Sequence, residues 1–106
     1  MKALEQAKWE ARARVIKAMA HASRLMMVEE LSRGERCVAE LTELVGADIS
    51  TVSKHLSVLK TAGLVEDRKQ GTQVYYRLST PCALSFFECV EKVLHANLQQ
   101  QILVAG

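Results

Sequence analysis

Short hydroxyl side chains and one ammonium group recur at helical spacing in residues 49–61. This polar set consists of Ser50, Thr51, Ser53, Lys54 and Ser57. Val52, Leu56 and Leu59 recur at the interval that places apolar residues on one face of a helix, so the polar set covers the other face. Short hydroxyl groups can approach base edges and phosphates without steric clash, and a lysine adds charge for the DNA backbone. The segment therefore predicts an exposed helix that is able to contact DNA.

His55 lies at the margin of this polar face. It could donate a hydrogen bond to a phosphate, or it could be a partly buried packing residue. The spacing leaves both roles open.

A β-hairpin is predicted immediately after this helix, over residues 64–79. Apolar and polar side chains alternate from 74 to 78, and residues 69–72 make a glycine-containing turn. Arg68, Lys69 and Thr72 then project from the hairpin tip, where they could meet a flanking minor groove or phosphates. Residues 49–78 carry five Lys or Arg against two Asp or Glu, a mild basic excess.

A shorter helix is predicted just before the polar one, over 38–45, ending at Gly46. Asp48 can cap the next helix by accepting hydrogen bonds from its free amides, and Gly63 ends that helix. Two short helices joined by a tight turn have the dimensions of a helix-turn-helix, here residues 38–62. With the hairpin as a wing, the expected fold is a winged helix-turn-helix, mainly α with one β-hairpin.

Helical patterns also flank this unit, over 3–19, over 22–32 and past Pro81. The last of them has more apolar face than a small monomer can cover, so we expect residues 82–103 to pack with 3–20 against a second copy. The 106 residues form one domain, 1–106, and a chain this short gains stability from a partner subunit.

The N-terminal segment and the cysteine content indicate where in the cell the chain is expected. The first 30 residues lack an uninterrupted apolar stretch, which predicts a cytoplasmic chain without a signal peptide or membrane span. Three cysteines without a CxxC pair argue against a secreted disulfide framework and indicate reduced thiols. The formal net charge of +2 says little about the partner by itself.

Three stretches resemble the ArsR/SmtB family of winged-helix metalloregulatory repressors. They are "HASRLMMVEEL", "GERCVAEL" and "STVSKHLSVLKTAGLVEDRKQGTQVYYRL", within a similarity that covers roughly residues 18 to 80. The resemblance implies a homodimer with the wing between its fourth and fifth helices. It also implies binding to a double-stranded operator of dyad symmetry and release from it when an effector binds. By the same resemblance, the DNA-reading element contains Ser50, Thr51, Ser53, Lys54 and His55.

The effector sites known in this family are only partly matched. In the arsenite type, E-x-C-V-C-D/E-L begins the third helix; the run here keeps Cys37 but has Ala39 at the second cysteine. The zinc-type ligand positions on the last helix fall on Thr80, Cys82, Val93 and Ala96, and the cysteine pair of the persulfide type falls on Glu29 and His95. None of the three sites is intact.

The remaining candidate ligands are the thiols of Cys37, Cys82 and Cys89. Soft thiolates favour trivalent arsenic, copper(I), cadmium or zinc. Cys82 and Cys89 are two helical turns apart, too far to share one ion from an unbroken helix, so a site would form across the dimer or would include Cys37. Alternatively, these cysteines are buried and behave as small hydrophobes. His21 is expected to cap or to lie at the surface near the start of the 22–32 helix.

The leading hypothesis is a dimeric repressor relieved by a thiophilic metal or metalloid such as arsenite, with no cofactor needed for folding. Sensing of oxidant or reactive sulfur by cysteine modification is one alternative. A ligand-independent regulator or a protein-interaction module is another. An enzyme is not expected, because the chain lacks a phosphate loop, a nucleophile motif and a paired acid and base.

Overall fold

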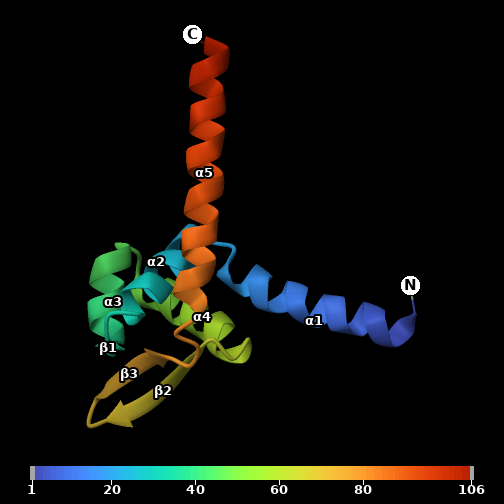
Figure 1. The fold of residues 1–106 in the computed structure, drawn as a ribbon. Coiled ribbons are helices and arrows are strands. Elements are labelled where there is room, and N and C mark those ends of the chain that lie inside the picture. Colours follow the sequence, from blue (N-terminus) through green and yellow to red (C-terminus); the bar gives the residue numbers. More distant parts are fainter. Residues whose placement is uncertain (1, 106) are drawn as a thin grey trace.

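Across residues 2–105, the part of the chain that the computed structural model describes, the fold consists of five helices and a small three-stranded sheet whose hairpin extends away from the helices (Figure 1). In chain order the elements are α1 (Ala3–Met19), α2 (Ala22–Leu31), β1 (Arg36–Cys37), α3 (Val38–Val45), α4 (Ile49–Thr61), β2 (Val65–Gln70), β3 (Gln73–Leu78) and α5 (Ala83–Ala105). The predicted winged helix-turn-helix is confirmed, with α3 and α4 as the helix pair and β2–β3 as the wing.

The sheet contains one strand, β1, that the sequence pattern does not predict. β1 is only two residues long, and it pairs antiparallel with β3 through Arg36 opposite Tyr76 and Cys37 opposite Tyr75. The strand order is β1-β3-β2. Two residues are too few to show an alternating pattern, so only the tertiary pairing reveals this strand.

Local signals set the ends of the helices as expected. The Asp48 carboxylate accepts a hydrogen bond from the Thr51 amide at 2.8 Å, and this caps α4. Gly46 has a φ of 75°, the left-handed conformation that lets the chain leave α3 and turn into α4. The expected capping role of His21 is also confirmed, because its Nδ1 accepts from the Ser23 amide at 3.1 Å.

The core lies where α2, α3 and α4 meet the base of the wing. Its fully buried side chains are Met27, Val28, Leu41, Val52, Leu56 and Leu59. Leu64, Val65 and Tyr76 extend it beneath the hairpin. Burying one large aliphatic side chain contributes roughly 1.5–3 kcal/mol, so these contacts hold α4 and the wing in a set relation to each other.

The two terminal helices project from this core (Figure 1). The radius of gyration is 16.8 Å, whereas a compact domain of this length has about 13 Å. Ala83 is the only buried residue among those described in α5, and Leu94 and Leu98 are each 55% exposed. No helix within residues 2–105 is long and apolar enough to cross a membrane.

Candidate nucleic-acid interface

The helix α4 has the two faces that its spacing predicts. Val52, Leu56 and Leu59 are fully buried against the core. The exposed face carries Ser50, Thr51, Ser53, Lys54 and Ser57. The three buried aliphatic side chains on one side therefore leave these five polar side chains exposed to solvent on the other.

The polar residues nearest the start of α4 also serve its cap. Ser50 donates its hydroxyl to Asp48 at 3.1 Å, and hydrogen bonds from the Thr51 side chain, the Thr51 amide and the Ser50 hydroxyl lower the pKa of Asp48. The ionised carboxylate at this end of the helix complements the helix dipole. Among the described residues, the side chains of Ser53, Lys54 and Ser57 make no such hydrogen bonds, so their polar groups are free to meet a ligand.

His55 is a partly buried packing residue that also keeps a polar ring nitrogen, so neither role left open by the sequence is excluded. The ring is half-buried, its centroid lies 4.4 Å from that of His21, and its Nδ1 lies 3.3 Å from Arg24 Nη1. Burial, followed by the nearby His21 and Arg24, lowers the pKa of His55. A guanidinium can only donate, so His55 Nδ1 is the acceptor in this contact, and in its neutral form the ring carries its proton on Nε2. The ring packs against α2 and still keeps one N–H donor.

Two basic residues of the wing, Arg68 and Lys69, lie in different environments. Lys69 and Thr72 are exposed at the hairpin, as expected. Arg68, however, forms an ion pair with Glu35, with Nε 3.1 Å from Oε2, and its guanidinium lies 4.9 Å from the Tyr75 ring centroid. The hydrogen bond from Arg68 is the main cause of the lowered pKa of Glu35.

Arg68 was predicted to project from the hairpin tip, and in the structure its half-exposed guanidinium is partly neutralised by Glu35. The sequence could not reveal this pair, because Glu35 lies 33 positions before Arg68. At the wing tip, Lys69 is the cation without an ion-pair partner among the described residues.

The three cysteines lie in different environments. Cys37 is buried between β1 and α3, and its amide donates to Glu40 Oε1 at 3.0 Å. This bond, with a second from the Cys37 thiol, lowers the pKa of Glu40. Cys82 and Cys89 are exposed free thiols at the start of α5 and within it. Within residues 2–105 of one chain, no three His, Cys, Asp or Glu side chains come together as a metal site.

This arrangement is similar to that of known regulators. A model described as "Bacterial regulatory protein, arsR family" matches residues 21–67. The biofilm growth-associated repressor of Xylella fastidiosa is 34% identical over 88 residues, which cover 83% of this chain and 77% of that protein. An HTH-type transcriptional regulator of Mycobacterium tuberculosis is 37% identical over 94 residues, 89% of this chain, but this chain spans only 42% of its length.

The fold comparison agrees with the sequence comparison. The homodimeric winged helix-turn-helix DNA-binding domain of a Mycobacterium bovis protein, a fragment solved by NMR, superposes with a TM-score of 0.78 at 34% identity. The match covers 94% of this chain and 93% of that fragment. The agreement therefore includes the terminal helices as well as the helix-turn-helix and the wing.

Proposed function

We propose that this chain, which belongs to the ArsR family of bacterial regulatory proteins, is a homodimeric repressor that binds a dyad-symmetric DNA operator through α4 and the wing. The family and the fold are those of DNA-binding transcriptional regulators, not of enzymes. The observation that carries the proposal is the outward polar face of α4, held by side chains that are fully buried in the core.

The terminal helices support the homodimer. Apolar side chains line α5 on the outside, and an apolar cleft of about 610 Å³ lies between α5, α2 and the end of α1. Its acidic lining residues are Glu29, Glu88 and Glu91. α1 carries four Lys or Arg against two Glu, so the α1 helix of a second copy has the complementary charge. A pair joined in this way can place its two α4 helices in successive major grooves, about 34 Å apart.

Operator binding tests the proposal directly. The double variant Ser53→Ala and Lys54→Ala removes two exposed side chains from the outward face of α4. We expect operator affinity to fall at least about tenfold and the salt dependence to weaken by about one phosphate contact. The melting temperature should stay nearly unchanged, because neither side chain is buried. Gel-shift titration at several salt concentrations and thermal unfolding measure the two effects.

The pair Ser85→Ala and Lys92→Ala is the matched control, since it removes one exposed serine and one exposed lysine from α5 instead. This control should keep the wild-type affinity. Strong destabilisation of the α4 variant with binding retained would refute the assignment of this face to DNA.

We further propose that operator release is triggered by a thiophilic metal or metalloid of the arsenite type bound by cysteine. The exposed thiols of Cys82 and Cys89 lie at the start of α5 and on it, the helix proposed to form the dimer. Since no three ligands gather within the described part of one chain, a three-coordinate site would draw ligands from both subunits. An effector that favours a different dimer geometry by a few kcal/mol is enough to release DNA.

Serine substitutions separate the contributions of the three thiols. Cys37→Ser should fold, because serine is a good residue at the position before a helix. Each variant that removes a ligand should bind operator normally and require at least about tenfold more arsenite for release, read by fluorescence anisotropy of labelled operator. A triple serine variant that responds to arsenite like the wild type would rule out the thiol site. Release by peroxide or a persulfide donor, but not by arsenite, would favour the cysteine-modification alternative.

A further inference from the structure

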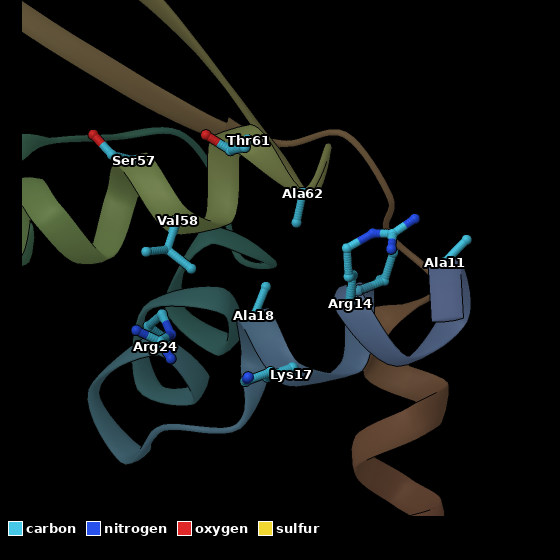
Figure 2. Close-up of a pocket in the computed structure, with 10 residues that line it drawn as sticks. Ala11, Arg14, Lys17, Ala18, Arg24, Ser57, Val58, Thr61 and Ala62 are labelled. Carbon is cyan, nitrogen blue, oxygen red and sulfur yellow. The ribbon is translucent and has the colours of Figure 1, made fainter. Parts of the chain in front are cut away.

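A groove of about 720 Å³ runs between α1 and α4 (Figure 2). Val58 of α4 and Ala62, which directly follows α4, point toward α1, and Ala18 points back toward α4 (Figure 2). Ala11 and Val15 continue the apolar lining along α1. The groove exists because three of these five side chains are alanines, too short to fill the space between the helices. Its volume lies within the range of small-molecule sites.

The charges that line the groove are all positive. Arg14 and Lys17 come from α1 and Arg24 from α2, and the lining includes no Asp or Glu. None of these three cations has an ion-pair partner among residues 2–105. The Nε atom of Arg24 is buried and has no hydrogen-bond partner there. A buried N–H without a partner is costly, so this donor favours an acceptor from outside the chain.

The proposed dimer does not need the groove face of α1. Successive helical residues are rotated by 100°, so Trp9 and Ile16 form one stripe, and Ala11 and Ala18 form another about 200° away. Ile16 lines the apolar cleft beside α5, and Trp9 is on the same stripe. Because the two stripes lie on nearly opposite sides of α1, packing through the Trp9 stripe leaves the groove open.

We propose that this groove is an effector site for a small amphipathic carboxylate, with its apolar part between α1 and α4 and its negative charge attracted by the lining cations, Arg14 at one end of the groove and Lys17 and Arg24 at the other (Figure 2). The site is separate from the cysteines. The effector role of this site rests on the proposed function, because it assumes that the dimer binds DNA. Binding of the carboxylate itself does not require DNA.

The lining favours a small ligand over the DNA backbone. Apolar side chains make up the floor, and they match a hydrocarbon or aromatic group better than a sugar-phosphate chain. Ser57, the last residue of the polar face, also lines the groove, so the groove adjoins the surface proposed to contact DNA. A ligand here touches both α1, which we propose to lie in the dimer interface, and α4. Its binding therefore changes the angle between these two helices and the spacing of the two α4 helices in the dimer.

Binding can be measured on the dimer without DNA. The probe is 2-naphthoate, titrated by calorimetry, with amide shifts in ¹⁵N-labelled protein locating the site. We expect one molecule per chain and shifts centred on Ala18 and Ala62. Arg14→Gln with Lys17→Gln should raise the dissociation constant at least about tenfold, because two of the three cations that line the groove are removed. Ala11→Phe should abolish binding by filling the groove.

Two controls test whether binding depends on where the protein carries its positive charge and on the negative charge of the ligand. Lys2→Gln with Lys92→Gln removes the same charge elsewhere and should leave the dissociation constant within about twofold. The uncharged 2-naphthol should bind at least about tenfold more weakly than 2-naphthoate. Equal binding of the two compounds, shifts centred on α5, or no binding at all would overturn the proposal.

Gel shifts with the same variants distinguish this proposal from the proposed function. If the Arg14 and Lys17 variant loses operator affinity while 2-naphthoate fails to bind the wild type, the groove contacts DNA phosphates and the effector site is refuted. If the wild type binds 2-naphthoate but no promoter DNA, the proposed function fails and the ligand site stands.

Discussion

Replacing two leucines of α5, Leu94→Glu and Leu98→Glu, is expected to convert the dimer into monomers and to lower operator affinity at least about a hundredfold. Both side chains are 55% exposed in the single chain and lie one turn apart on the apolar stripe. Placing two carboxylates in an apolar interface costs several kcal/mol of desolvation, which a short interface cannot offset. Each monomer would then contact only one half of the operator. Sedimentation velocity and gel-shift titration measure the two effects.

The matched control is His95→Glu with Gln99→Glu. It introduces the same two carboxylates at the same spacing, one residue further along the helix and on its more polar side. This variant should remain dimeric and bind operator. If both variants dissociate, or if neither does, the apolar stripe of α5 is not the dimer contact that we propose.

Leu56→Ala is expected to lower the free energy of unfolding by about 2–5 kcal/mol. Leu56 is 0% exposed and belongs to the cluster that anchors α4 beneath the wing. Truncation leaves a cavity that close-packed neighbours fill only in part, so the lost packing adds to the lost hydrophobic transfer energy. Operator binding should fall as well, because the position of the polar face depends on this anchor. Urea unfolding at a fixed protein concentration measures the loss, since the stability of a dimer depends on concentration.

Val58→Ala provides the comparison on the same helix. Val58 is 40% exposed and lines the groove between α1 and α4, so its truncation should cost less than about 1 kcal/mol. Equal losses for the two variants would contradict the assignment of α4 to one buried and one exposed face.

Much of the fold could be predicted because its signals are local. The helical interval of Val52, Leu56 and Leu59 predicts which face of α4 is buried, and the structure agrees. Asp48 and Gly46 mark the start of α4 and the end of α3 through their own backbone preferences. The glycine-containing turn and the alternation after it predict the wing. Each of these features depends on residues within about one or two turns of each other.

The features that could not be predicted join residues far apart in the chain. Arg68 is held by Glu35, 33 positions away, and His55 is oriented by Arg24, 31 positions away. The strand β1 exists only because β3 lies beside it. No periodicity indicates which of several surface charges will meet, because weak surface ion pairs depend on the final placement of both side chains.

The sequence by itself determined the order of the five helices and the hairpin, the buried face of α4 and the polar residues on its outside, since these follow from spacing and from backbone preferences of single residue types. Only the tertiary structure decided that Arg68 pairs with Glu35, that His55 Nδ1 meets Arg24, that the three cysteines form no three-ligand cluster within the described part of one chain, and that a cationic groove opens beside α4. The physical reason is that a helix period specifies directions around one axis. Contacts between elements depend on how several axes pack together.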